Sequence, residues 1–209
     1  MPPPIPKKPV GTPLFGIARP TLVIECFLDL CCPFSKKMFV ALTTQVLNAG
    51  PDKFGGQVEL VFQNVPQPWH AQSSYMHEVA LAVSLVNEAA FYPAVSAIFE
   101  AQTDFFDDKV MDKTRSQVYS DLIDVVVPAL AAAGFAEVTA DAIGEKLALT
   151  GEGNSGSAVT LPMKWAIKYH RLRSIHVTPT VLVNGIEAPD ISSGWTGEQW
   201  DEKIAALLA

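Results

Sequence analysis

The sequence predicts an α/β fold in which a helical segment separates two β-containing parts. Residues 21–70 have the pattern strand–helix–strand, and residues 162–209 have the pattern helix–strand–strand–helix. Residues 71–161 lie between them and carry apolar side chains at helical spacing. A chain of 209 residues can bury one core as a single domain, or as a small domain that carries an insertion. The pattern favours the insertion, with residues 1–20 as a separate N-terminal arm.

The first β-containing part opens with a strand at residues 21–30, TLVIECFLDL. This apolar run has the length of a strand and starts with β-branched residues, which is typical of a strand buried on both faces. A helix is expected after Pro33 and ends at Gly50–Pro51. Its apolar stripe consists of Met38, Phe39, Leu42, Val46 and Leu47. Residues 58–66, VELVFQNVP, form the next strand, and a parallel crossover of this kind should be right-handed.

The helical insertion contains several separate patterns. A long one begins at Ser73 or Ser74, either of which can cap it. Its apolar positions Met76, Val79, Ala80 and Val83 repeat at helical spacing. Pro93 is expected in the first turn of the following helix. Residues 116–134 form another helical candidate, which Pro128 should interrupt.

The second β-containing part has clear turn and cap signals. Residues 176–185, HVTPTVLVNG, form a strand with a proline at its entrance. The strand closes on Asn184–Gly185, a strong hairpin signal, so the residues that follow should pair with it. Thr196 can cap the last helix, and Gln199 stands at the capping-box position.

The composition is that of an ordinary globular protein and argues against some partners. Hydrophobic residues make up 49% of the chain and charged residues 18%. The formal net charge of −7 argues against a nucleic-acid partner, because phosphate binding requires a basic face.

The N-terminal arm, residues 1–20, is rich in proline and is expected to be extended. It lacks the run of roughly 7–15 apolar residues that a secretory signal needs. No segment approaches the roughly 18 apolar residues of a membrane span. We therefore expect a cytoplasmic protein without a membrane partner, although a mature form that has lost its signal would look the same.

The three cysteines, Cys26, Cys31 and Cys32, are odd in number and clustered, so they form no disulfide framework. The four histidines are His70, His77, His170 and His176. They lie far along the chain without ligand spacing, and no metal site is expected. Cys26 falls within the expected strand and is interpreted as a buried free thiol. A bridge between the neighbours Cys31 and Cys32 would need a strained peptide.

Cys32 stands where a reactive thiol is expected. It directly precedes a helix, where unpaired N–H groups and the helix dipole favour a thiolate over a thiol. Pro33 suits the first helical turn, and Cys31 should point back toward the strand. Thr178–Pro179 is a candidate cis peptide bond at a strand entrance. Such a bond would leave a backbone edge free to pair with an extended substrate.

These two motifs carry a resemblance to a known family. The pattern F-x-D-x-x-C-P-F-x, followed far downstream by V-T-P-T-x-x-V-N-G, resembles the thioredoxin superfamily. The intervening helical block, and the stretch PQPWHAQSSYMHEVALA, are similar to the DsbA-like branch. The closest resemblance is to poorly characterised eukaryotic DsbA-like proteins that carry C-P-x-S. The resemblance covers residues 21–209 and implies a thioredoxin-like fold with an inserted helical subdomain.

The resemblance also implies roles for individual residues. Cys32 matches the nucleophilic cysteine of the family. Pro33 and Phe34 match the variable pair that tunes it, while Thr178–Pro179 matches the cis-proline loop. Ser35 departs from the pattern, because the family's oxidases and reductases have a resolving cysteine at that position.

The departure at Ser35 decides the functional hypothesis. A dithiol enzyme releases its mixed disulfide by attack from the second thiol, and a serine cannot make that attack. Ser35 could donate a hydrogen bond to the Cys32 thiolate, which would favour the thiolate further. It could equally do no more than satisfy a backbone N–H group. We therefore expect a monothiol (CxxS) thiol–disulfide oxidoreductase, with glutathione as a candidate co-substrate and no other cofactor.

Two alternatives stay open at this point. One is an enzyme similar to the kappa-class glutathione transferases and the related isomerases. A sizeable apolar pocket beside Cys32 would favour it. The other is a binding module that keeps only the scaffold, which a deeply buried and inert Cys32 would support.

Three further side chains are candidates for the surroundings of the thiol. Trp69 and His70 come just after the second strand and could line the site, and a His–Cys pair would activate the thiol. A histidine at such a junction is also commonly structural. Phe34 is expected as an exposed apolar group that contacts substrate. His77 and His170 are expected on helix faces without a functional role.

Overall fold

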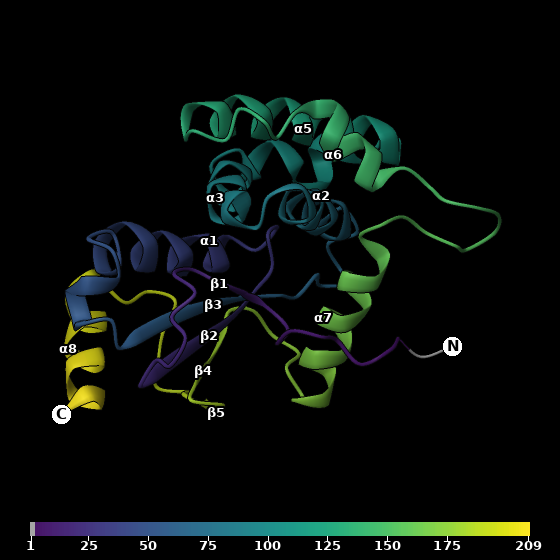
Figure 1. Cartoon of the computed structure of the whole chain (residues 1–209). Coiled ribbons are helices and arrows are strands. Elements are labelled where there is room, and N and C mark those ends of the chain that lie inside the picture. The colour runs from purple at the N-terminus through teal and green to yellow at the C-terminus, as the bar shows by residue number, and fades with distance from the viewer. Residues whose placement is uncertain (1–2) are drawn as a thin grey trace.

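A mixed β-sheet forms the centre of the computed structural model, which describes residues 3–209 (Figure 1). Within those residues the sheet has five strands in the order β1-β3-β2-β4-β5. Their bounds are β1 Thr12–Pro13, β2 Leu22–Leu28, β3 Val58–Asn64, β4 Thr180–Val183 and β5 Ile186–Glu187. Strands β2 and β3 are parallel, and the other neighbours are antiparallel. The predicted α/β class and the β–α–β opening are confirmed.

The helix after Pro33 differs from the expected single helix. Helix α1 spans Pro33–Val40, and a π-helical stretch continues it over Ala41–Val46. The hydroxyl groups of Thr43 and Thr44 donate hydrogen bonds to backbone carbonyls four residues back, which competes with the regular α-helical pattern. A 3-10 turn at Pro51–Phe54 then leads into β3.

The N-terminal arm is bound to the sheet by strand pairing and hydrogen bonds. This contact was not predicted from the sequence. Thr12 and Pro13 form β1, an edge strand antiparallel to β3. The residues that follow β1 are also held: the backbone N–H groups of Phe15 (2.9 Å) and Ile17 (2.6 Å) donate to the buried carboxylate of Glu59. A strand of two residues has no periodicity of its own, so only its pairing with β3 defines it.

Most of the helices between β3 and β4 form a layer on the α1 side of the sheet. Figure 1 shows α2, α3, α5 and α6 gathered there, while α7 and α8 lie at opposite ends of the molecule. The bounds are α2 Ser73–Val86, α3 Phe91–Glu100, α4 Asp107–Val110, α5 Arg115–Ala132, α6 Ala140–Leu147 and α7 Thr160–Leu172. Short 3-10 turns, Glu88–Ala90 and Gln102–Phe105, flank α3. The division of the chain at residues 71 and 161 remains a prediction.

Two expectations about these helices were wrong. Helix α5 continues through Pro128 instead of breaking there. Proline removes one N–H donor and crowds the preceding turn, but Leu122, Val126 and Leu130 are all buried and hold the turns on both sides against the core. Ser73 is the first helical residue of α2, not its cap. Pro93 lies in the first turn of α3, as predicted.

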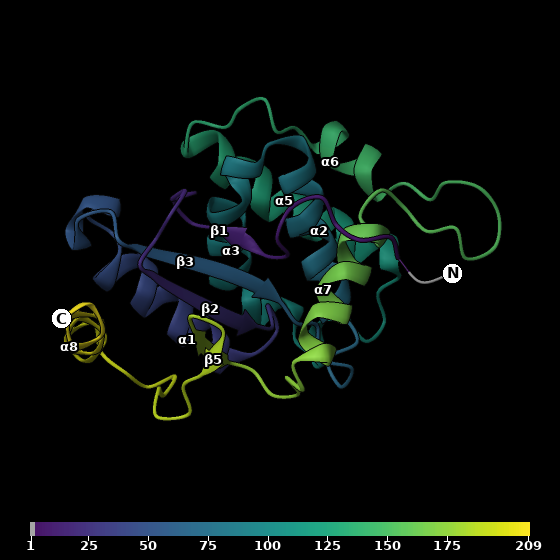
Figure 2. The ribbon, with the colours of Figure 1, turned by 60° about the horizontal axis from the view of Figure 1, so that its bottom comes forward.

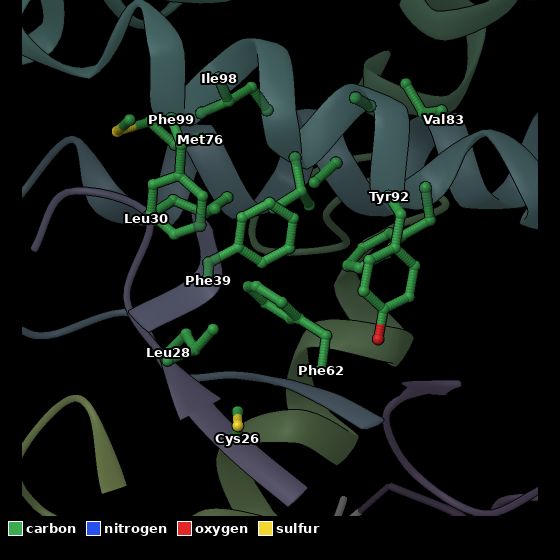
Figure 3. Close-up of a cluster of buried hydrophobic side chains, with 14 of the residues drawn as sticks. Cys26, Leu28, Leu30, Phe39, Phe62, Met76, Val83, Tyr92, Ile98 and Phe99 are labelled. Atoms are coloured by element: carbon green, nitrogen blue, oxygen red, sulfur yellow. The ribbon is translucent and has the colours of Figure 1, made fainter. Parts of the chain in front are cut away.

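An aromatic cluster fills the space between the sheet and the helical layer (Figure 3). Phe39 of α1 lies at its centre, with ring centroids 5.1 Å from Phe99 and 6.2 Å from Phe62. Cys26 of β2 borders the same cluster and is 1% exposed. The interpretation of Cys26 as a buried free thiol is confirmed.

The second β-containing part follows its local sequence signals closely. The Thr178–Pro179 bond is cis, as expected. Strands β4 and β5 pair as a hairpin across Asn184–Gly185, both with positive φ. Helix α8, Gly197–Leu208, begins with the predicted capping box of Thr196. None of the helices within residues 3–209 is both long and apolar enough to cross a membrane.

Candidate functional site

Cys32 lies at the N-terminus of α1. It is the N-cap residue: its N–H donates to the carbonyl of Asp29 (3.0 Å), and its own carbonyl accepts from the N–H of Lys36 (3.1 Å). No side chain caps this helix end. Pro33 has no N–H group, so the N–H groups of the residues directly after it are the ones that can face an anionic sulfur, as expected from the sequence.

The Cys32 thiol contacts the cis-proline loop. Its Sγ donates to the backbone carbonyl of Thr178 over 3.5 Å, across 146 residues of sequence. The cysteine is 7% exposed, so a narrow part of its surface is open to solvent. The fold thus joins the two motifs that carried the functional hypothesis.

Ser35 does not contact Cys32 by a hydrogen bond in the part of the chain that the structure describes. It is fully buried, and its Oγ accepts the backbone N–H of Asp29 (3.2 Å). This geometry corresponds to the simpler of the two interpretations, in which the hydroxyl satisfies a backbone donor. Support of a Cys32 thiolate by Ser35 stays a prediction.

Asp29 is the centre of the site; it belongs to the F-x-D-x-x-C-P-F-x motif, but no role was predicted for it from the sequence. Its fully buried carboxylate accepts the N–H of Cys31 (2.9 Å) and contacts Nδ1 of His70 (2.7 Å). The Ser73 hydroxyl donates to the same carboxylate. Burial raises the pKa of Asp29, but the neighbouring His77 ring and the hydrogen bonds from Ser73 and Cys31 outweigh it and leave the pKa below its usual value. The residue is therefore a buried carboxylate that fixes the backbone just before Cys32.

His77 is not the passive helix-face residue that the sequence suggested. It is fully buried, and its Nε2 accepts the N–H of Leu30 (3.2 Å). Its Nδ1 therefore carries a proton, which it donates to Oδ1 of Asn64 (2.8 Å). His77 thus links the segment before Cys32 to the end of β3.

His70 and Trp69 lie in the segment after β3, and their role in binding substrate stays a prediction. The His70 ring binds Asp29 and makes no hydrogen bond to the Cys32 sulfur among the described residues. The proposed His–Cys pair is therefore not formed in this structure. Trp69 is 60% exposed and packs edge-on against His70.

The other two cysteines are poor nucleophiles. The Cys31 sulfur accepts a hydrogen bond from Gln72 (3.2 Å) and is buried. Burial and the negative charge of Asp29 raise the pKa of Cys31 to about 12. Burial and the charge of Glu25 also raise the pKa of Cys26 far above its ordinary value. Cys32 is the thiol best placed for exchange chemistry.

Exposed apolar side chains flank the segments that meet at Cys32. Phe34 is 63% exposed in the first turn of α1, and Val177 is 52% exposed next to the cis-proline loop. Phe34 was expected to be exposed, whereas Val177 was not singled out by the sequence. Their exposure leaves apolar surface available to a substrate at the thiol.

Neither of two sizeable cavities in the described chain includes the thiol. A cavity of about 560 Å³ lies under the N-terminal arm, and one of about 460 Å³ lies between α5 and α6. Cys32 and Thr178 line neither of them, so neither supplies the apolar pocket that would favour a glutathione transferase. Within residues 3–209, no group of three or more His, Cys, Asp or Glu side chains is arranged to hold a metal ion.

Sequence comparisons give no relative for this chain. No protein-family model matches it, and no curated protein matches its sequence.

Solved structures do match its fold. A proposed protein-disulfide isomerase from Pseudomonas syringae has a TM-score of 0.70 and 23% identity, covering 93% of this chain and 97% of that one. DsbA2 from Pseudomonas aeruginosa has a TM-score of 0.58 and 15% identity, covering 98% and 97%. Oxidised BdbD from Bacillus subtilis has a TM-score of 0.55 and 15% identity, covering 95% and 92%. The chain has the thioredoxin-like fold of DsbA-like proteins.

Proposed function

We propose that this protein is a DsbA-like thiol–disulfide oxidoreductase that works through the single thiol of Cys32. The observation that carries the proposal is the position of this sulfur, at an uncapped helix N-terminus and 3.5 Å from the carbonyl that precedes the cis-proline. The names of structural neighbours, a protein-disulfide isomerase and DsbA2 among them, support the same class of chemistry.

The reaction is an exchange of disulfide bonds with no net oxidation of the protein. The Cys32 thiolate attacks one sulfur of a substrate disulfide, a mixed disulfide forms, and the other substrate sulfur leaves as a thiolate. An external thiol then attacks as its thiolate, forms a new disulfide with the bound half, and restores the Cys32 thiolate. Glutathione is our candidate for that external thiol.

The substrate would be a thiol or disulfide, either protein or small molecule, held beside the thiol. Thr178 and Pro179 would present backbone to an extended substrate. Pro33 and Phe34 would contact it from α1, and Trp69 from the loop after β3.

Changing Ser35 to cysteine should convert the protein from a monothiol to a dithiol enzyme. In the wild type the mixed disulfide has no resolving thiol, so it should persist when no external thiol is added. In Ser35→Cys, the new thiol at the same helix end should release the bound half and leave a disulfide between Cys32 and the introduced sulfur. We expect the lifetime of the glutathione adduct to fall at least roughly tenfold, since an intramolecular thiol acts at high effective concentration.

The measurement is intact-protein mass spectrometry after a pulse of oxidised glutathione and removal of excess reagent. Ser155→Cys, at an exposed loop position, is the matched control that adds a thiol far from the site. An unchanged adduct lifetime in a folded Ser35→Cys protein would show that a thiol at position 35 cannot reach the Cys32 sulfur. The mixed disulfide of the wild type would then persist for a reason other than the missing resolving thiol at position 35.

A further inference from the structure

A second site lies under the N-terminal arm. The cavity of about 560 Å³ is bounded by the arm, by α2 and by α7. Figure 2 shows the arm running from β1 across α2 and α7 toward the N-terminus. The volume falls within the range of roughly 300–1,000 Å³ that is typical of small-molecule sites.

The arm is held in place as one wall of this cavity. The indole Nε1 of Trp165 donates to the carbonyl of Pro4 (2.7 Å). Lys8 forms an ion pair with Glu88 in the 3-10 turn that follows α2 (2.8 Å). Gln63 of β3 donates to the carbonyl of Val10 (2.9 Å). Three contacts with different elements therefore fix the arm over the cavity.

The walls are largely apolar. Leu81 and Leu85 of α2 and Leu161 of α7 line the cavity together with Trp165. Leu85 is 45% exposed and Leu161 is 37% exposed, although both stand on helices that pack in the fold. These side chains offer apolar surface to a ligand.

One buried polar group at the cavity has an unused donor. Asn64 is 4% exposed and lines the cavity. Its Oδ1 accepts the proton of His77, which fixes the orientation of the carboxamide. Its NH₂ group makes no hydrogen bond within residues 3–209. The group is not among the fully buried polar atoms that lack a partner, so it remains accessible and can donate to a ligand oxygen in the cavity.

The rim of the cavity adds a positive charge. Lys7 lines it and forms no ion pair in the described part of the chain, while its neighbour Lys8 is already paired with Glu88. A free cation at the rim and a free amide donor at Asn64 both favour an anionic oxygen ligand.

We propose that this cavity binds an apolar carboxylate, with its hydrocarbon part against the leucines and Trp165 and its carboxylate accepting a hydrogen bond from Asn64. The site is separate from Cys32 and does not depend on the thiol chemistry proposed above.

The test uses decanoate as the probe and decylamine as a matched probe of opposite charge. Two-dimensional ¹H–¹⁵N NMR of the full chain follows the side-chain amide of Asn64 and the indole N–H of Trp165. We expect decanoate to shift both signals at up to about 1 mM, and decylamine to bind at least roughly tenfold more weakly. No shift with decanoate, or equal shifts with both probes, would overturn the proposal.

Two variants locate the binding site. Asn64→Asp keeps the oxygen that His77 needs but replaces the donor by a second oxygen, and should weaken decanoate binding at least roughly tenfold. Leu85→Glu places a charge on the apolar wall and should also weaken decanoate binding at least roughly tenfold. This variant leaves the Asn64–His77 hydrogen bond unchanged. Leu207→Glu is the control, since Leu207 is 42% exposed on the distant α8. Binding that survives both cavity variants would contradict the site.

Discussion

Cys32→Ser should abolish the mixed disulfide that the wild-type protein forms with oxidised glutathione, whereas Cys26→Ala should leave it intact. Cys32 is the thiol at the helix N-terminus and contacts Thr178. Cys26 is 1% exposed in the core. The loss should be complete, because a serine hydroxyl does not attack a disulfide under these conditions.

Adduct formation is measured by intact mass and localised by peptide mass spectrometry under non-reducing conditions. Cys31→Ala is the further control, since that sulfur is buried and its pKa is raised to about 12. Equal adduct formation in Cys32→Ser and Cys26→Ala would contradict the assignment of the nucleophile.

Asp29→Asn should lower the free energy of unfolding by about 3 kcal/mol near neutral pH, as breaking a buried and fully hydrogen-bonded charge network does. The carboxylate is 0% exposed, and donors from Cys31, His70 and Ser73 converge on it. An amide of the same size would turn an NH₂ group toward some of those donors. The adduct yield at Cys32 should also fall, because the Asp29 carboxylate holds the N–H of Cys31, the residue directly before Cys32.

The difference in the free energy of unfolding between wild type and Asp29→Asn should depend on pH, because the pKa of Asp29 is lowered in the folded state. The folded state binds the proton of this group less readily than the unfolded state does. Its stabilising contribution is therefore fully present above about pH 3.9, the ordinary value for aspartate, and is lost as the pH falls through the lowered folded-state value. The gap between wild type and Asp29→Asn should be constant above about pH 5 and shrink below about pH 4.

Urea denaturation at several pH values measures the gap. Asp124→Asn, at an exposed position of α5, is the matched control and should change stability by less than about 0.5 kcal/mol. A gap for Asp29→Asn that is similarly small at neutral pH would show that the network contributes no net stability.

The elements that the sequence predicted well are those with strong local signals. The Asn184–Gly185 hairpin and the capping box at Thr196 depend on residues close together in the chain, and both are confirmed. The elements it missed depend on distant partners. Strand β1 exists because Thr12 pairs with Phe62. Helix α5 continues through Pro128 because the turns before and after the proline are both packed against the core.

The same distinction between local sequence signals and distant partners holds for the residues of the site. Cys32 and Thr178 were predicted to act together because each belongs to a recognisable motif, and the structure brings them into contact. The partners of Asp29 were not predicted, since His70 and Ser73 lie 41 and 44 residues away. A single carboxylate at the end of an apolar strand was nevertheless a usable signal, because a buried charge requires donors around it.

The most direct test of the account is the rate of alkylation by iodoacetamide at each of the three cysteines of the folded protein, followed by peptide mass spectrometry across a range of pH. We predict that Cys32 reacts faster than the same cysteine in an unfolded control peptide, while Cys26 and Cys31 stay protected. A Cys32 that reacts no faster than an unfolded control peptide would contradict the account. The protein would then be a scaffold that retains the fold without its thiol chemistry.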